Sequence, residues 1–335
     1  MQTTRLGRTG LVVSRIALGM MTYGTPKWRP WVLDEDASRP LVKRAVELGV
    51  NFFDTADMYS AGESEVLSGR FVREFCRREE VVIATKLFFP VVMDPKTARP
   101  GPNTQGLGRK RIFHAVDDSL RRLGTDYIDL YQIHRFDPQV PVEETMEALH
   151  EVVKAGKVRH LGASSMWAWQ FAKMQDAARR HGWTPFSSMQ NHYNLAYREE
   201  EREMLPLCRD QGVAVLPWSP LARGFLAGNR TAADKSAGAT SRAQTDDLAQ
   251  NYYYRASDFA TADRLKAMAA DKGVSPATLA YAWLLHQPAV TAPIVGASKL
   301  PQLDDAAAAV ELRLSADELK ALGEGYEPHP VLGHA

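Results

Sequence analysis

Four ionisable side chains of the sequence have types and positions that suit proton transfer. Asp54, Lys86 and His134 directly follow the apolar runs NFF, VVIAT and IDLYQI, and Tyr59 lies five residues after Asp54. A phenol has a pKa of about 10, which is too high for efficient acid–base chemistry near neutrality, but a neighbouring ammonium lowers that pKa. We therefore expect Tyr59 to be a proton donor with Lys86 beside it.

The other two side chains would support this pair. Asp54 can hold the Lys86 ammonium in place and offset its desolvation cost. His134, as a neutral imidazole, can donate a hydrogen bond to a carbonyl oxygen and orient it. A lone polar residue at a strand end is more often a cap or an ion-pair partner, but several that converge on one rim favour an active site. Together they predict a proton-donating pocket that needs a source of hydride.

Strands and helices must position these residues. Short β-rich runs alternate regularly along the chain with longer stretches in which apolar residues have helical spacing. The alternation predicts parallel strands with crossover helices, and eight strands predict a (β/α)₈ barrel whose active site lies where the strands end. We expect one domain over 1–335, an N-terminal β-hairpin under the barrel, and long loops over 88–108 and 222–254 on the active-site face. The expected strands are 16–18, 51–53, 81–85, 128–133, 158–161, 187–189, 213–216 and 290–294, and the expected helices lie near 37–48, 63–76, 109–123, 142–155, 167–180, 199–210, 257–271, 276–286 and 301–310.

The composition of the chain excludes several kinds of binding partner. The chain has 41 basic and 40 acidic residues, so no field of one sign attracts nucleic acid or an anionic membrane. Cys76 and Cys208 suggest neither a disulfide framework nor a metal cluster. The N-terminus lacks a signal-peptide pattern, and no apolar run approaches the ~20 residues that span a bilayer. We expect a cytoplasmic protein with a small-molecule partner and no metal; a homo-oligomer is compatible with the sequence.

Seven short motifs, taken in order and spacing, resemble those of the aldo-keto reductase family over nearly the whole chain. The resemblance implies a tetrad of Asp54, Tyr59, Lys86 and His134, with hydride delivered from NADPH to an aldehyde or ketone. The long loop after the seventh strand resembles the bacterial and potassium-channel β-subunit branch. The motifs are NFFDTADMY (51–59), IATK (83–86), LGTDYIDLYQIH (123–134), GASS (162–165), QN (190–191), PWSPLARG (217–224) and IVGASK (294–299).

Residues at strand ends and in the following loops could bind NADPH/NADP⁺. Trp218 offers a flat face for the nicotinamide, and Ser164 and Gln190 could hold its carboxamide. The turn after the seventh strand could bind the pyrophosphate, and the helix that opens after Lys299 could bind the 2′-phosphate through its N-terminus. An ordinary helix cap with a solvated lysine is the alternative there. The full expected set is Met21, Thr22, Asp54, Ser164, Gln190, Trp218, Ser219, Leu221, Arg223, Gly224, Gly296, Ser298, Lys299, Gln302 and Asp305.

The chain differs from the family pattern at three positions. Ser165, Lys299 and Ala306 stand where many members carry asparagine, arginine and asparagine. Aromatic residues in the irregular segments could form a substrate wall, pack loops against the barrel or lie in a subunit interface. The candidates for the wall are Tyr23, Trp28, Trp31, Phe88 and Phe89, with Tyr252, Tyr253 and Tyr254 in the second loop.

Other classes of enzyme fit less well. No Gly-x-Gly-x-x-Gly string indicates a Rossmann dehydrogenase, and no His-x-His pair indicates a barrel metallohydrolase. The alternative that the sequence leaves open is a regulatory subunit that keeps NADPH as a redox sensor and turns over very slowly. Turnover with generic aldehydes would separate a sensor from an enzyme.

Overall fold

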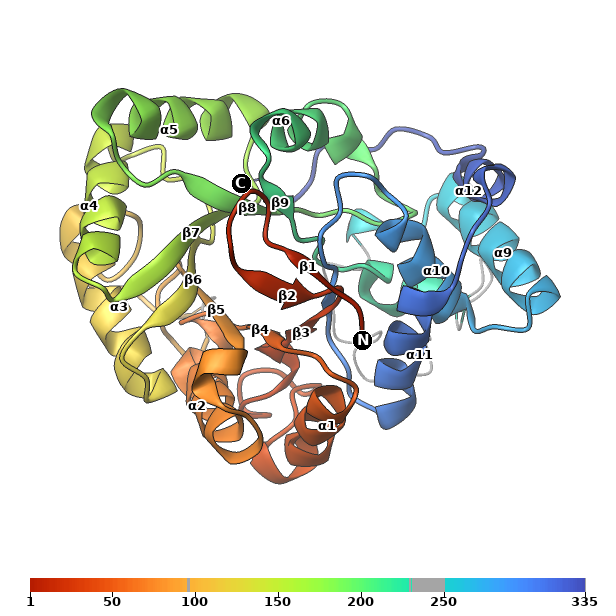
Figure 1. Cartoon of the computed structure of the whole chain (residues 1–335), viewed down its shortest axis with the longest axis horizontal. Coiled ribbons are helices and arrows are strands. Elements are labelled where there is room, and N and C mark those ends of the chain that lie inside the picture. Colours follow the sequence, from red (N-terminus) through yellow and green to blue (C-terminus); the bar gives the residue numbers. More distant parts are fainter. Residues whose placement is uncertain (95–96, 229, 231–250, 335) are drawn as a thin grey trace.

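Eight parallel strands form the centre of the molecule. The structure is a computed structural model that describes residues 1–94, 97–228, 230 and 251–334. Neighbouring strands of the sheet follow chain order, and the last strand returns beside the first (Figure 1). The strands are β3 Ala17–Gly19, β4 Phe52–Asp54, β5 Val82–Leu87, β6 Ile128–Ile133, β7 Val158–Ser164, β8 Phe186–Gln190, β9 Ala214–Val215 and β10 Ile294–Val295.

The two edges of this sheet meet and close a (β/α)₈ barrel, as the sequence predicts. Val215 of β9 forms a parallel bridge with Val290. The Ile294 N–H donates to the carbonyl of Pro217 over 2.8 Å. The predicted eighth strand is therefore correct in place but begins too early, since the continuous strand starts at Ile294. Pro293 has no N–H to give to a ladder, which explains the late start.

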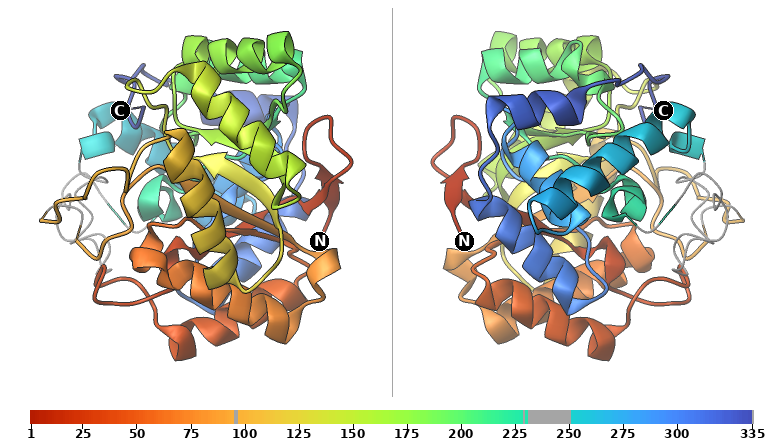
Figure 2. Two further views of the ribbon diagram at one scale, coloured as in Figure 1. Left: turned by 90° about the vertical axis from the view of Figure 1, so that its left-hand side faces the viewer. Right: turned by 90° about the vertical axis from the view of Figure 1, so that its right-hand side faces the viewer.

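An N-terminal hairpin covers the end of the barrel where the strands begin. β1 (Thr3–Arg5) pairs antiparallel with β2 (Val12–Ser14). The turn between them docks on the Gly212 carbonyl, which accepts a hydrogen bond of 2.9 Å from the Arg8 N–H. The side views of Figure 2 show this hairpin in red, next to the N-terminus and on the opposite side of the molecule from the C-terminus. Its buried apolar side chains complete a cluster inside the barrel that contains Leu6, Val13, Ala17, Phe52, Val82, Ala84, Leu130, Ala214, Leu216 and Ala292.

Helices surround the barrel and bury their apolar faces against it, except that α9 packs on α10 and α12 on α9, outside the ring (Figures 1 and 2). Gly124 and Gly212 end α3 and α6 in the left-handed conformation, with φ of 61° and 66°. No helix among the described residues is long and apolar enough to cross a membrane. The helices are α1 Glu35–Glu47, α2 Glu63–Phe75, α3 Arg109–Leu123, α4 Val142–Lys154, α5 Ala168–His181, α6 Met204–Gln211, α9 Ala256–Asp271, α10 Pro276–Leu285, α11 Leu300–Glu311 and α12 Ala316–Gly323, with short 3₁₀ turns η1 Met20–Thr22, η2 Tyr59–Gly62, η3 Arg78–Glu80, η4 Glu199–Glu201 and η5 Ala222–Ala227.

The predicted helix over 199–210 is two elements, η4 and α6. Pro206 lies three positions into α6, and proline, which lacks an N–H, is tolerated in the first turn of a helix but not in its interior. The α-helix therefore starts just before this proline. The glutamates of η4 therefore lie before the α-helix, and Glu200 pairs with His334, as described below.

Candidate active site

Strand geometry places the polar residues of the barrel interior in one layer. Side chains alternate along a strand, so Phe52 and Asp54 share one face of β4, while Val82 and Lys86 share one face of β5. Phe52 and Val82 belong to the apolar cluster inside the barrel. Asp54 and Lys86 lie beyond it, at the ends of their strands, where they are 2% and 0% exposed. Apolar packing at one end thus supports a polar layer at the other.

Lys86 joins two of the predicted catalytic side chains. Its Nζ donates to Asp54 Oδ1 at 2.5 Å, to the Thr55 carbonyl at 2.8 Å and to the Tyr59 hydroxyl at 3.4 Å. Burial works against the charged form of Lys86, but the attraction of Asp54 and Tyr59 outweighs it and raises the lysine pKa. Lys86 is therefore an ammonium at neutral pH, with all three N–H groups directed to oxygen.

The second oxygen of Asp54 is held by two amides. Gln132 Nε2 and Gln190 Nε2 each donate to Asp54 Oδ2 at 2.9 Å, and Gln190 Nε2 also lies 3.2 Å from Gln132 Oε1. Gln190 was predicted as a carboxamide ligand, and here its amide nitrogen is already engaged. Gln132 was not predicted at all. A signal for it exists, because it is a polar residue inside an apolar strand, two positions before His134.

Tyr59 lies in a loop with a strained backbone. Ser60 and Ala61, the next two residues, have φ of 51° and 53°, a left-handed conformation that non-glycine residues rarely adopt. The loop is held from both sides: Ser60 Oγ accepts from the Thr25 N–H at 3.2 Å, and Asp57 accepts from Arg111 at 2.7 Å. These contacts keep the Tyr59 hydroxyl over the Lys86 ammonium.

The pKa of Tyr59 differs from the expectation that Lys86 would lower it. Burial is the largest effect and raises the tyrosine pKa above its ordinary value, while the Lys86 charge acts in the opposite direction. The expectation considered only the neighbouring charge and not the loss of solvent. Tyr59 is consequently a neutral phenol at neutral pH, which is the form that a proton donor needs.

His134 is a neutral imidazole next to Tyr59. Its ring centre lies 5.7 Å from that of Tyr59 and 5.1 Å from that of Phe89, both edge to face. Burial, followed by the charges of Lys86 and Arg135, lowers the histidine pKa well below its ordinary value. Its Nδ1 has no hydrogen-bond partner among the described residues. A neutral ring in this place can donate one hydrogen bond to a carbonyl oxygen.

Four of the five aromatic residues predicted for the substrate wall lie around these side chains. Trp28 contacts Tyr59 at 6.1 Å and Trp31 at 6.3 Å between ring centres. Phe88 contacts Phe89, which lies against His134. Tyr23, the fifth, is 0% exposed and belongs to the hydrophobic core. A fully buried side chain does not line an open pocket, so this assignment is corrected to a core role.

Trp218 is backed on one face by two further rings. The His192 ring lies 4.2 Å from Trp218 and 3.9 Å from Tyr197, each with planes within 11°, and Trp218 Nε1 donates to Ser165 Oγ at 2.9 Å. The indole is thereby fixed while the residue stays partly exposed. His192 was missed, since nothing in its local sequence indicates a stacking partner.

The end of the chain passes beside this stack. The Leu332 N–H donates to the Tyr197 hydroxyl at 2.9 Å, and His334 pairs with Glu200 at 2.7 Å. A Cβ on Gly333 would come within 3.2 Å of the Trp218 ring. The last residues described therefore form part of the rim around Trp218.

The predicted carboxamide residues end strands β7 and β8, and the predicted pyrophosphate residues lie in the turn that follows Trp218. Ser164 Oγ donates to the Gln190 carbonyl at 3.1 Å. Ser219 and Arg223 have φ of 52° and 57°, and Gly224 has φ of 91°, so the turn that contains Leu221 curls tightly. Backbone concavities of this kind bind anions through their N–H groups.

The N-terminus of α11 is capped from within. Gln302 Oε1 accepts from the N–H groups of Ser298 at 2.7 Å and Lys299 at 3.1 Å. Lys299 is exposed, and no hydrogen bond or ion pair of its side chain is found among the described residues. Thr22 adjoins Gly296, where a Cβ would meet Thr22 Oγ1 at 3.1 Å; Met21 beside it is partly exposed. Lys299 therefore offers a positive charge to a phosphate here. Gln302 would have to release the N–H groups of Ser298 and Lys299 before it could bind a phosphate.

Asp305, one of the residues expected to bind the coenzyme, already accepts hydrogen bonds from two side chains at the start of α10. Its Oδ1 accepts from Ser275 Oγ at 2.9 Å and from Thr278 Oγ1 at 3.2 Å. Ser275 is the N-cap of α10, so the carboxylate ties α11 to α10. A structural role accounts for Asp305.

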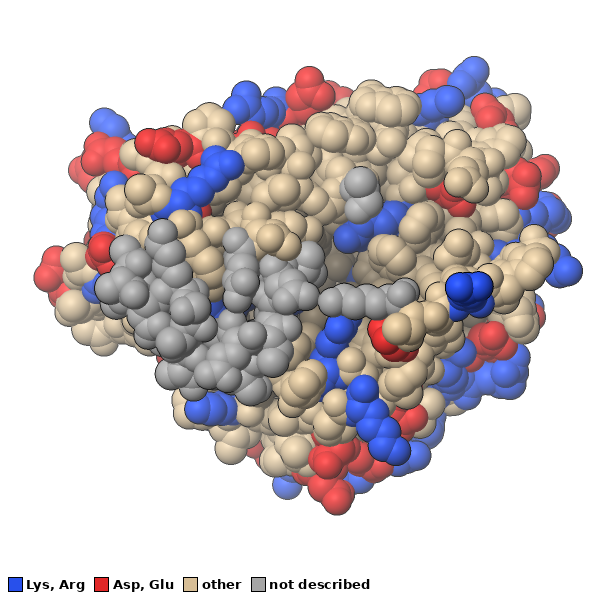
Figure 3. All heavy atoms as spheres, turned by 180° about the vertical axis from the view of Figure 1, so that it is seen from behind, with Lys and Arg blue, Asp and Glu red and all other residues tan. Residues whose placement is uncertain are grey.

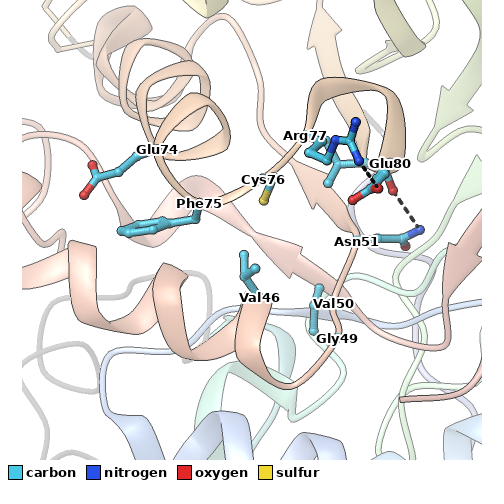
Figure 4. A pocket seen from close by; sticks show the side chains of 10 residues that line it. Val46, Gly49, Val50, Asn51, Glu74, Phe75, Cys76, Arg77 and Glu80 are labelled. Carbon is cyan, nitrogen blue, oxygen red and sulfur yellow. Dashed lines mark hydrogen bonds and ion pairs between the residues drawn. The ribbon is translucent and has the colours of Figure 1, made fainter.

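A surface pocket at the other end of the barrel does not belong to this site (Figure 4). It is lined by ends of α1 and α2 and by Asn51, which precedes β4, whereas Asp54 ends that strand. Burial raises the pKa of its Cys76 thiol to about 11, so the thiol is not a nucleophile near neutrality. Among the described residues, no three His, Cys, Asp or Glu side chains are grouped as metal ligands would be.

A parallel barrel that ends in a carboxylate, an ammonium, a phenol and a neutral imidazole defines a class of oxidoreductases that act on carbonyl groups. Comparison with known proteins agrees: residues 15–327 match the model of the aldo/keto reductase family. The chain belongs to this family.

Several curated fungal proteins are similar over nearly their whole length. A putative aryl-alcohol dehydrogenase of Schizosaccharomyces pombe is 46% identical, covering 98% of this chain and 96% of its own. Versiconal hemiacetal acetate reductase of Aspergillus parasiticus is 45% identical, covering 99% and 98%. A putative aryl-alcohol dehydrogenase of Saccharomyces cerevisiae is 40% identical, covering 97% and 96%. The chain is thus an aldo-keto reductase and an oxidoreductase.

Proposed function

We propose that this protein reduces an aldehyde or ketone to the alcohol with NADPH, and that Tyr59 supplies the proton. The proposal depends on the position of the buried Lys86 Nζ, which lies 2.5 Å from the buried Asp54 and 3.4 Å from the hydroxyl of the partly exposed Tyr59. This arrangement holds a neutral phenol beside an ammonium that stabilises the phenolate once the proton has left.

The residues present fit a nicotinamide dinucleotide. Trp218 is fixed by His192 behind it and by Ser165 at its N–H, so its other face suits a flat ring. The turn around Leu221 and Arg223 suits a pyrophosphate, and Lys299 at the start of α11 suits a 2′-phosphate. When bound, NADPH would supply the hydride for the reduction.

The chain's own residues then act on the carbonyl group. His134 and Tyr59 donate hydrogen bonds to the carbonyl oxygen, which fixes its position and stabilises the negative charge that develops there. The Tyr59 proton passes to that oxygen as hydride reaches the carbon, and the product is a neutral alcohol. Lys86, held by Asp54, stabilises the phenolate that remains until Tyr59 takes a proton from solvent. Trp28 and Phe89 beside these groups favour an aromatic or apolar substituent.

Single-turnover reduction of benzaldehyde with NADPH tests the proposal. Tyr59→Phe keeps the ring and should bind NADPH normally, as measured by fluorescence titration, while the rate falls by orders of magnitude. Tyr127→Phe is the matched control, because Tyr127 precedes β6 at the opposite end of the barrel. Reduction by Tyr59→Phe at the wild-type rate would refute the mechanism.

The same measurement distinguishes an enzyme from a redox sensor. A regulatory subunit of the channel β-subunit type would retain its nucleotide and reduce generic aldehydes very slowly. The similar fungal proteins, which are named as dehydrogenases and reductases, support turnover. The loop on which the resemblance to that branch depends lies largely outside the described residues.

A further inference from the structure

Arg135, the residue after His134, is a cation at the active site that the proposed mechanism does not use. Its Nη1 donates to the His134 carbonyl at 2.6 Å, and its guanidinium lies 5.5 Å from the centre of the Phe89 ring. Both contacts hold the plane of the guanidinium beside the predicted substrate wall. The residue remains partly exposed.

No carboxylate neutralises this guanidinium among the residues that the structure describes. Burial lowers the arginine pKa from its ordinary value, and the neighbouring phenols of Tyr59 and Tyr252 oppose this only in part. Nε is buried without a hydrogen-bond partner, and Nη2 has none within the described ranges. Lys86, by contrast, has a carboxylate partner, because its Nζ lies 2.5 Å from Asp54 Oδ1.

An unpaired and partly desolvated guanidinium costs free energy. Cation–π contact with Phe89 and one bond to a backbone carbonyl recover part of that cost. Neither contact requires a residue with five N–H donors, and a planar donor fork matches a carboxylate. On the space-filling view, the described atoms around the hollow of the face opposite the hairpin include basic side chains (Figure 3).

We propose that Arg135 binds a carboxylate of the substrate, so that this enzyme prefers carbonyl compounds that carry an acid group, such as aromatic aldehyde acids. The proposal rests on carbonyl reduction at Tyr59 as proposed above. The carbonyl group would lie against Tyr59 and His134, the apolar part against Phe89 and Trp28, and the carboxylate against Nη2 of Arg135, since Nε is buried.

Matched pairs of substrates test this preference. Wild-type enzyme and NADPH are given 4-carboxybenzaldehyde and its methyl ester, and then the 3-carboxy pair, which moves the acid to a different distance from the aldehyde. We expect kcat/KM to be at least tenfold higher for the acid than for the ester in one of the pairs, with most of the difference in KM. Added salt should reduce this ratio.

Arg135→Gln should lower the acid-to-ester ratio by tenfold or more, and Arg135→Lys, which keeps the charge without the fork, should give an intermediate ratio. Arg29→Gln is the matched control, because Arg29 lies 5.5 Å from the Trp28 ring and should leave the ratio within twofold of wild type. A purely structural Arg135 would change kcat for acid and ester alike. A ratio near one in the wild type, or an equal loss in Arg29→Gln, would overturn the proposal.

Failure of this inference is distinguishable from failure of the proposed function. If the enzyme reduces benzaldehyde but shows no preference for the acid over the ester, the proposed function stands and the role of Arg135 is refuted. Equilibrium binding to the NADP⁺ complex of the hydroxymethylbenzoate isomer, 4- or 3-, that corresponds to the preferred carboxybenzaldehyde gives a readout without turnover. Binding that is at least tenfold weaker in Arg135→Gln supports the assignment, and unchanged binding refutes it.

Discussion

Gly162 of β7 leaves no room for a methyl group beside Gln132 of β6: a Cβ on Gly162 would lie 2.9 Å from Gln132 Cγ. The two residues are register partners in neighbouring strands. The Gln132 amide can therefore reach Asp54 only because residue 162 has no side chain.

Gly162→Ala should therefore affect both stability and activity. The added carbon would also meet Ser188 Oγ at 2.5 Å, and overpacking of this kind costs about 1–3 kcal/mol in unfolding free energy. A displaced Gln132 would release Asp54 Oδ2 and lower kcat. Urea unfolding and steady-state kinetics measure the two effects. Gly10→Ala, where a Cβ meets nothing within 4 Å, is the control, and an equally small effect at both sites would contradict the prediction.

Lys86→Met should raise the pH at which reduction falls off. The reaction needs Tyr59 as a phenol, so activity declines as pH rises through the tyrosine pKa, and the Lys86 charge lowers that pKa. The variant leaves Asp54 buried without its partner, which costs about 3–5 kcal/mol. The double variant Asp54→Asn/Lys86→Met removes both charges and should be more stable than Lys86→Met. A pH–rate profile that does not move would argue against coupling of Lys86 and Tyr59.

His192→Ala should weaken binding of the nicotinamide coenzyme, although we expect His192 to act through Trp218 and not to contact the coenzyme. The ring supports Trp218 from behind, and an aromatic pair contributes about 0.5–1.5 kcal/mol, equivalent to roughly 2- to 12-fold in affinity. Fluorescence titration of NADPH measures the change. Affinity equal to that of wild type would mean that the indole holds its place through Ser165 alone.

Lys299→Ala should reduce the preference for NADPH over NADH. Lys299 is the exposed cation at the start of α11, where a helix N-terminus and a charge would share a 2′-phosphate. The ratio of the two dissociation constants is the measurement, and Lys320→Ala on α12 serves as the control for loss of one positive charge. An unchanged ratio would place the 2′-phosphate elsewhere.

The free energy of unfolding should decrease as pH falls below about 6.5. Burial lowers the pKa of both His134 and His192 well below that value, so in this range the unfolded chain binds protons that the folded chain does not. The loss is at most about 1.4 kcal/mol per pH unit for each imidazole. Urea unfolding at several pH values should show a smaller slope in His134→Gln. The same slope in both proteins would mean that His134 ionises in the folded state.

The sequence predicts the parts of this enzyme that depend on strand ends. Carboxyl ends of parallel strands share one rim, so Asp54 and Lys86 could be placed together from the ends of two apolar runs, and Tyr59 from its distance to Asp54. Seven of the eight strands follow from the alternation of strands and helices, and the hairpin follows from the turn at Gly7 to Gly10. The eighth strand starts late because Pro293 cannot join a ladder.

The remaining features depend on contacts between distant segments. Gln132 acts through a carboxylate 78 positions earlier, and Trp218 stacks on a histidine of the preceding strand's loop. Burial, which the sequence does not measure, decides the direction of the Tyr59 pKa and removes Tyr23 from the pocket. Asp305 and Gln302 were assigned to the coenzyme on residue type, and the hydrogen bonds that they make at helix N-termini could not be foreseen.

The two ends of the chain differ in a way that matters for preparing the protein. Leu332, Gly333 and His334 contact Tyr197, Trp218 and Glu200, so a purification tag fused after them would emerge beside Trp218, where we propose that the coenzyme binds. Met1 lies beside Gly49, next to the hairpin at the closed end of the barrel (Figure 2). Kinetic work on this enzyme therefore calls for an N-terminal tag.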